Sequence, residues 1–201
     1  MAKRRFFTVL SALLLTLTCI FSPLTLISCD SEQTDKLVFQ LNEDQITYSV
    51  VKYKGYGGTV TIPEYYNDMR VTEIKNGAFS GSTVKKVILP ETITKIGQGA
   101  FSNCVSLKTI NIPESVIEIG HIAFTNCRNL KSVTLPLGLL SIYESSFCYC
   151  LDATIRYEGT KAELTSIMLN PRYFDAMGAI TYDYEIECSD GKIYIVTPYF
   201  K

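Results

Sequence analysis

The chain has 201 residues, 47% of them hydrophobic, a formal net charge of −1 and a single histidine. This near-neutral balance excludes a basic nucleic-acid-binding domain, and one imidazole is too few for the usual acid–base or metal sites. We therefore expect one globular domain that is not an enzyme, holds no metal or cofactor and binds no nucleic acid.

The N-terminus has the pattern of an export signal. Three basic residues at 3–5 precede an apolar run over 6–27, as in a secretory signal peptide. The run ends in Leu26-Ile27-Ser28-Cys29, which resembles the lipobox of bacterial lipoproteins, and the resemblance implies cleavage before Cys29 and its lipidation. An uncleaved membrane-spanning anchor is the alternative, since about 20 apolar residues cross a bilayer. Pro23 and the position of the cysteine argue against that alternative.

Residues 1–28 are thus predicted to be a lipoprotein signal peptide and residues 29–36 a tether. Without the signal peptide the chain has 16 basic and 20 acidic residues, so it is not drawn to anionic lipid. Acyl chains on Cys29 would then hold it to the membrane. The tether is short, polar and unpatterned, which is typical of a flexible segment. We expect a lipid-anchored protein of the bacterial cell envelope, with display at the cell surface as a further hypothesis.

Residues 37–58 are predicted to form an N-terminal cap hairpin. Apolar and polar residues alternate from Leu37 to Leu41 and again from Ile46 to Val50, and the polar residues 42–45 form a turn signal between them. A hairpin at this place would cover core that the first repeat otherwise exposes to water.

Residues 59–158 contain a repeat. Prolines at 90, 113 and 136, phenylalanines at 101, 124 and 147, and cysteines at 104, 127 and 150 each recur every 23 residues, and such a period indicates a solenoid. Leu107, Ile110 and Ile112 show the spacing of a strand that points alternate side chains into a core. A proline follows each such run and ends the strand. We expect one strand per unit, with alanine and phenylalanine filling the far side of the core.

The order of leucine, proline, isoleucine-glycine, alanine-phenylalanine and cysteine resembles the BspA-like leucine-rich repeats of bacterial surface proteins. We predict a mainly β solenoid of about four to five coils, with a hairpin cap before it and a helix-plus-hairpin cap after it. The first unit departs from the pattern, because Ser82 replaces the cysteine and four extra residues separate Pro63 from Ile74. The fourth has Tyr143 for glycine and Ser146 for alanine. We interpret these departures as decay that terminal coils tolerate.

Residues 159–201 are predicted to form the C-terminal cap. Thr160 and Glu163 fit a capping box before an apolar face at helical spacing, and Pro171 would stop that helix. Two strand-like runs with a turn between them follow, namely 179–188, the turn Ser189-Asp190-Gly191, and 192–198.

Five cysteines remain in the mature domain. Cys104, Cys127 and Cys150 lie in equivalent positions, and stacking at about 4.8 Å with parallel Cβ vectors favours buried thiols over disulfides. A disulfide from Cys188 to Cys148 or Cys150 stays open as an alternative. Zinc is not expected, because four ligands do not converge on one line of stacked residues.

The solvent-facing strand positions supply the candidate binding residues. Three lysines form a column along the stack, and Glu64, Glu91 and Glu114 form another just past the prolines. Stacked like charges repel each other mildly, so an anionic ligand that bridges the lysines would remove this repulsion. The alternative is that the lysines are solvated residues that protect strand edges. His121 occupies a variable position and is expected at the surface. The candidate binding residues are Lys85, Lys86, Lys108, Thr109, Asn111, Lys131, Ser132 and Thr134.

This predicted face is small. Strand spacing gives it about 300 Å², whereas a standard interface buries about 800 Å² per partner. We therefore expect weak or multivalent binding, or contacts that include the caps. The hypothesis is a membrane-anchored protein-binding or adhesion module with a host, matrix or envelope protein as partner, adhesion being what the family resemblance implies. The alternative is a structural or assembly component of the envelope that binds a protein of the same cell. The sequence does not indicate an oligomeric state.

Overall fold

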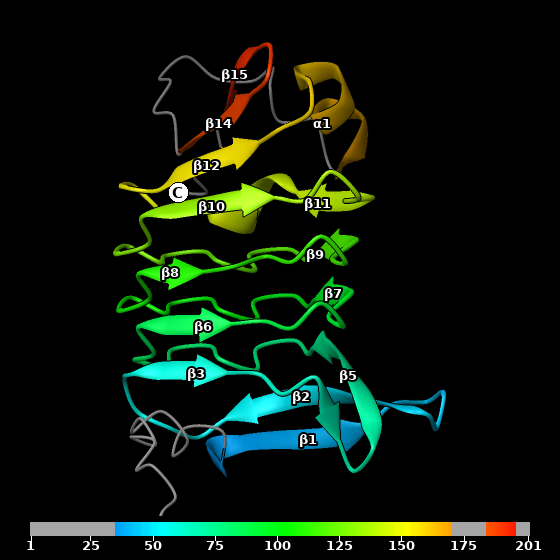
Figure 1. Ribbon diagram of the computed structural model, residues 1–201. Coiled ribbons are helices and arrows are strands. Elements are labelled where there is room, and N and C mark those ends of the chain that lie inside the picture. The colour runs from blue at the N-terminus through cyan, green and yellow to red at the C-terminus, as the bar shows by residue number, and fades with distance from the viewer. Residues whose placement is uncertain (1–34, 170–183, 196–201) are drawn as a thin grey trace, which may run out of the picture.

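The computed structural model describes residues 35–169 and 184–195 (Figure 1). The predicted signal peptide, Cys29 with most of the tether, Pro171 and the outer parts of the last two predicted strands lie outside these residues. Within the described part, the chain winds into a mainly β solenoid of about five turns, with two sheets along its axis. No helix in this part is long and apolar enough to cross a membrane.

Sheet 1 contains the strands that the repeat spacing predicts, followed by two strands of the predicted C-terminal hairpin. Its strands pair in parallel from β3 to β14, and only the last pair, β14 and β15, is antiparallel. The order along the axis is β3 (Thr59–Thr61), β6 (Lys86–Ile88), β8 (Thr109–Ile110), β10 (Ser132–Leu135), β12 (Thr154–Tyr157), β14 (Tyr184–Cys188) and β15 (Gly191–Ile195).

Sheet 2 adds a second strand to each coil, which the expectation of one strand per unit did not include. In the middle coils these strands contain only two or three residues each, and Ile96, Ile119 and Ile142 point from them into the core. The order is β1 (Leu37–Leu41), β2 (Thr47–Tyr53), β5 (Met69–Ile74), β7 (Lys95–Ile96), β9 (Glu118–Ile119), β11 (Ser141–Tyr143) and β13 (Met168–Leu169), with β4 (Tyr65–Tyr66) beside β5.

A column of aromatic rings runs through the core between the sheets. The rings of Phe79 and Phe101 stack with centroids 4.9 Å apart, those of Phe101 and Phe124 at 5.3 Å, and those of Phe124 and Phe147 at 5.0 Å. All four side chains are buried. Tyr53 stacks on one end of the column at 5.0 Å, so the N-terminal cap continues the same pattern. The alignment predicted from the period is confirmed.

The repeated cysteines form a parallel column of thiols. Each thiol donates a hydrogen bond to the phenylalanine carbonyl of the preceding coil, from Cys104 to Phe79 at 3.0 Å, from Cys127 to Phe101 at 3.2 Å and from Cys150 to Phe124 at 3.1 Å. Burial raises the pKa of Cys104, and the neighbouring Cys150 thiol together with burial raises the pKa of Cys127, so both stay protonated donors at neutral pH. Cys104, Cys127, Cys150 and Cys188 carry free thiols, so the alternative disulfide from Cys188 is not formed.

The four extra residues of the first unit form an ordered hairpin. Strands β4 and β5 pair antiparallel around Asn67 and Asp68, whose φ angles of 49° and 61° suit a two-residue turn. The ring of Tyr66 in this hairpin stacks on Phe39 of β1 with centroids 4.1 Å apart. The predicted cap hairpin, β1 with β2, is therefore held from the side by the insertion.

The departures of the fourth unit coincide with a change of turn. Gly99 and Ile122 have left-handed φ angles of 59° and 50° in the preceding coils, whereas the fourth coil has a short 3₁₀ helix, η2 (Glu144–Phe147), at this place. Ser146 in this helix is buried and donates to the carbonyl of Gly120 at 3.1 Å, which satisfies its hydroxyl.

The C-terminal cap contains one helix, α1 (Lys161–Ile167), among the described residues. Thr160 and Glu163 form the predicted capping box, which is confirmed. The helix ends before the predicted stop at Pro171, because Met168 is extended and pairs in β13 with Ile142 of β11. Strands β14 and β15 meet at the predicted turn around Ser189 and Asp190.

Candidate binding face

The outer face of sheet 1 carries the predicted binding residues. Side chains alternate along each strand, so Val87, Ile110 and Val133 fill the core and their neighbours face solvent. Strand pairing places Lys86 opposite Thr109, and Thr109 opposite Ser132. These residues therefore form one exposed row that crosses the coils.

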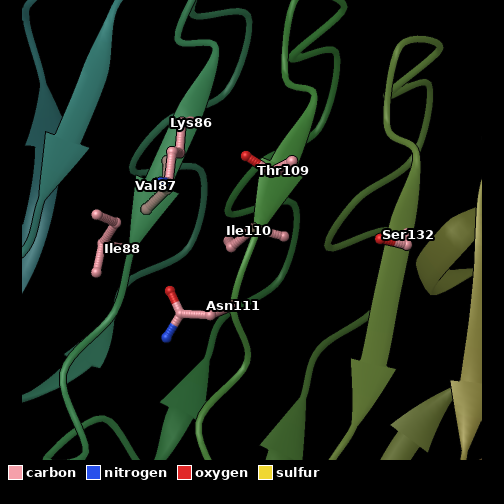
Figure 2. A pocket seen from close by; sticks show the side chains of 7 residues that line it. All are labelled: Lys86, Val87, Ile88, Thr109, Ile110, Asn111 and Ser132. Carbon is pink, nitrogen blue, oxygen red and sulfur yellow. The ribbon is translucent and has the colours of Figure 1, made fainter.

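A shallow hollow of about 400 Å³ lies on this face (Figure 2). The short side chain of Thr109 stands between Lys86 on one neighbouring strand and Ser132 on the other. Ile88 lies further along the strand of Lys86, and Asn111 directly follows the strand of Thr109. Its full lining is Lys86, Val87, Ile88, Thr109, Ile110, Asn111 and Ser132. Four of the predicted binding residues thus meet at the hollow, and Ile88 adds an apolar wall that the prediction did not include.

Asn111 has a structural role at the edge of the hollow. Its Oδ1 accepts from the backbone N–H of Leu89, and its Nδ2 donates to the carbonyl of Leu89, both at 2.9 Å. Strand β6 ends at Ile88, so the amide side chain replaces the next pair of ladder hydrogen bonds. Figure 2 shows Asn111 directed toward the neighbouring coil. Asn111 therefore helps to shape the edge of the hollow, and no sequence signal distinguishes this role from ligand binding.

The lysine column lies one residue before the row of the hollow. Backbone hydrogen bonds from Lys108 to Lys85 at 2.8 Å and from Lys131 to Lys108 at 3.1 Å hold the three residues in register. All three are exposed. Lys131 Nζ lies 3.6 Å from Asp152 Oδ2, whereas within residues 35–169 and 184–195 no ion pair involves Lys85 or Lys108. The positive charge of Lys85 and Lys108 is therefore not neutralised by an ion pair in this part of the chain.

The C-terminal end of sheet 1 is different in charge. Arg156 Nε lies 3.0 Å from Glu187 Oε2, and Lys192 Nζ lies 3.8 Å from Glu187 Oε1. Lys192 also binds Glu185, and that hydrogen bond raises the pKa of Lys192. Acids and bases neutralise each other here, so the positive potential of the face belongs to the part around β6, β8 and β10.

The glutamate column lies beyond the opposite ends of the same strands. Glu64, Glu91 and Glu114 are exposed, and Leu137 occupies the equivalent place in the fourth unit. The polar strip of sheet 1 is therefore bordered by lysines along one side and by glutamates along the other. Thr134 lies within the strip, exposed and opposite Arg156.

The remaining candidate chemistry is sparse. His121 is exposed, and its ring makes an edge contact with the ring of Tyr143 at 5.8 Å. In the described ranges, no three side chains of histidine, cysteine, aspartate or glutamate are grouped as metal ligands. Among the described residues, the outer face of sheet 1 is therefore the candidate binding face, because its side chains are exposed and the repeat places them at regular intervals.

Comparisons with known proteins point to one repeat family. The family model described as a BspA type leucine rich repeat region matches residues 54–169 in six copies. A leucine-rich-repeat protein of T. pallidum is similar in structure, with a TM-score of 0.52 and 24% identity over 61% of this chain and 69% of that chain. A comparison with curated proteins finds no match.

Two further solved structures share the fold. A leucine-rich repeat protein from Bacteroides capillosus has a TM-score of 0.50 and 24% identity, over 62% of this chain and 95% of that chain. A leucine rich cell surface protein from Faecalibacterium prausnitzii has a TM-score of 0.50 and 23% identity, over 77% of this chain and 53% of that chain. At these identities the likeness shows the fold alone.

Proposed function

Since the chain belongs to the BspA-type leucine-rich repeat family, we propose that it is a protein-binding module of the bacterial envelope, anchored through lipid on Cys29 and binding through the outer face of sheet 1. The module acts in adhesion, with a host or matrix protein as its partner. The anchor rests on the sequence pattern that ends at Cys29.

One observation carries the binding proposal: the exposed side chains of sheet 1 are ordered by the fold but are not needed for its core. The core residues beneath them are buried and complete, with Val87 at 1% and Val133 at 2% exposure. Lys86, Thr109 and Ser132 stand over this core at strand spacing. The strand backbone that presents these side chains is already held in place by the ladder, so binding a partner costs little backbone conformational entropy, which favours recognition.

The size of the face limits the affinity. An area of about 300 Å² is well below the roughly 800 Å² per partner of a standard interface. A single domain therefore binds weakly through sheet 1 alone. Many copies on one envelope would compensate, because tethered sites act at a high effective concentration.

Site-specific crosslinking tests the binding face. A photoreactive residue at Thr109 should form adducts with a partner on intact cells, whereas the same residue at the exposed Lys52 of β2 on sheet 2 should not. Equal adducts from both positions, or none from Thr109, would reject sheet 1 as the binding face. Adducts that contain only proteins of the same envelope would replace adhesion by an assembly role.

The anchor has its own test. Mass spectrometry of the membrane-extracted chain should find acyl groups on Cys29 as its first residue. Cys29→Ala should release the protein from membranes, because the acyl chains supply its attachment. A Cys29→Ala variant that remains membrane-bound would reject the lipid anchor.

A further inference from the structure

The outer face of sheet 1 is as wide as one α-helix. Strands β6, β8 and β10 contain 3, 2 and 4 residues. At about 3.3 Å per residue their strip is on the order of 10 Å wide, which is the diameter of an α-helix with its side chains. A partner that presents two helices side by side, or a broad domain surface, would be wider than this strip and would also cover the turns past the prolines.

The spacing along the axis also matches a helix. Successive coils rise by about 4.8 Å, in agreement with the ring separations of 4.9 to 5.3 Å in the core. A helix rises about 5.4 Å per turn, so two turns differ from two coils by only about 1.2 Å. Same-side residues of an extended peptide are about 6.7 Å apart, so two such steps miss the lysine column by about 4 Å.

The charges indicate which helix would fit. Lys85 and Lys108 are exposed without an ion pair in the described residues, and Lys86 beside them also has none. An acidic side chain on each helical turn would meet one lysine per coil. The glutamates past the prolines would repel acids on the other side of the helix, so the partner's acids must form a single stripe.

The hollow supplies a place for one apolar side chain. Ile88 and the methyl group of Thr109 border it, while the amide of Asn111 uses its oxygen and one of its two N–H donors on the Leu89 backbone. A small aliphatic residue next to the acidic stripe would cover Ile88, and the second N–H of the exposed Asn111 can bind water or a polar group of the partner.

We propose that sheet 1 binds an amphipathic α-helix of a partner protein, laid along the solenoid axis with about one helical turn per coil and with a stripe of acidic residues on the lysine column. This inference rests on the proposed function, because it identifies the class of partner for the same face. The proposal also gives the rotation of the bound helix about its own axis. Its acidic stripe must lie on the lysine side of the face, because the glutamate column borders the other side.

Two stapled helical peptides of equal composition test the proposal on the full chain. One carries glutamates once per turn in a single stripe, and the other distributes them around the helix. Fluorescence anisotropy should show the striped peptide binding about tenfold more tightly, because only it pairs several charges at once. Equal affinity of the two peptides would overturn the proposal.

Variants locate the contact. Lys108→Glu should weaken binding of the striped peptide about tenfold, because it exchanges an attractive pair for a repulsive one, while Lys52→Glu on sheet 2 should leave it unchanged. A peptide with a lysine stripe should bind the Lys85→Glu/Lys108→Glu variant more tightly than the native chain. An unchanged affinity of Lys108→Glu, with circular dichroism showing a native fold, would reject the lysine column as the site.

A competitor separates a helix from any polyanion. Unstructured polyglutamate of the same charge should displace the striped helix only weakly, and binding as tight as that of the helix would overturn the geometric match. If crosslinking from Thr109 captures a partner but the striped helix does not bind, the proposed function stands and the helical partner is wrong. If crosslinking from Thr109 captures no partner and the striped helix does not bind, both the proposed function and the helical partner are wrong.

Discussion

The phenylalanine column and the lysine column come from the same repeat but have opposite consequences. The rings of Phe101 and Phe124 stack inside the core with centroids 5.3 Å apart, and each ring shields apolar surface of the next from water. Lys85 and Lys108 are linked by a backbone hydrogen bond of 2.8 Å on the surface, where each charge repels the next. Repetition therefore stabilises the interior, while on the surface it creates a regular pattern that the fold does not require.

The largest effect is expected from the interior column. Phe124→Ala should destabilise the protein by about 3–5 kcal/mol, because it removes two ring stacks and leaves a cavity in the middle of the solenoid. Urea denaturation followed by circular dichroism measures the change. Leu151→Ala is the control, since Leu151 is 72% exposed and its loss should cost under about 0.5 kcal/mol. If both variants lost a similar amount of free energy of unfolding, the stacked phenylalanines would not be what stabilises the solenoid.

The close approach of coils gives the second effect. A Cβ added at Gly120 would lie 2.7 Å from the backbone nitrogen of Gln98, so Gly120→Ala should cost about 1–3 kcal/mol through overpacking. Gly138→Ala is the matched control, because its nearest atom, the carbonyl oxygen of Glu114, is 3.4 Å away. The same denaturation experiment compares the two, and an equal loss would reject the steric explanation.

The C-terminal cap should show a smaller and more local effect. Thr160→Ala should cost about 1 kcal/mol by removing the cap of α1. Hydrogen bonds to Thr160 lower the pKa of Glu163, so this stabilisation is present above the ordinary value of 4.5 and is lost as the pH falls through the lowered pKa. The protection of the α1 amides, relative to the intrinsic exchange rate at each pH, should therefore fall on acidification. The Thr160→Ala variant should lose the part of this pH dependence that comes from the hydroxyl and keep the part that comes from the backbone N–H of residue 160, which still donates to Glu163.

The smallest effect on stability is expected from the surface column. Lys108→Glu should change the free energy of unfolding by under about 0.5 kcal/mol, because Lys108 is exposed and its change only relieves weak repulsion. A loss of more than about 1 kcal/mol in urea denaturation would mean that the column belongs to the scaffold. The contrast with Phe124→Ala is the direct measure of how the two columns differ.

Several features could be predicted because they depend on spacing alone. The 23-residue period was enough to align Phe101, Phe124 and Phe147, since equal spacing brings equal residues to the same place in every coil. The capping box at Thr160 was also predictable, because its two hydrogen bonds are local in the chain.

Other features could not be predicted, because they depend on contacts between coils that the repeat does not encode. Two-residue strands such as β7 and β9 are defined by their pairing with neighbouring coils, and they are too short to show a periodic pattern in the sequence. The hairpin at Asn67 and Asp68 looked like a decayed repeat, and its use became visible only when Tyr66 met Phe39.

The sequence by itself determined that the chain is a capped solenoid with lysines along one side of its strands, because both statements follow from periodic residues and local signals. Only the tertiary structure decided that Asn111 binds the Leu89 backbone and that Thr109, Ser132 and Ile88 enclose a hollow. The physical reason is that β8 ends at Ile110, opposite Val87, before the backbone N–H and C=O of Leu89 can pair with it. Which side chain supplies the missing hydrogen bonds depends on the coil stacked beside Leu89.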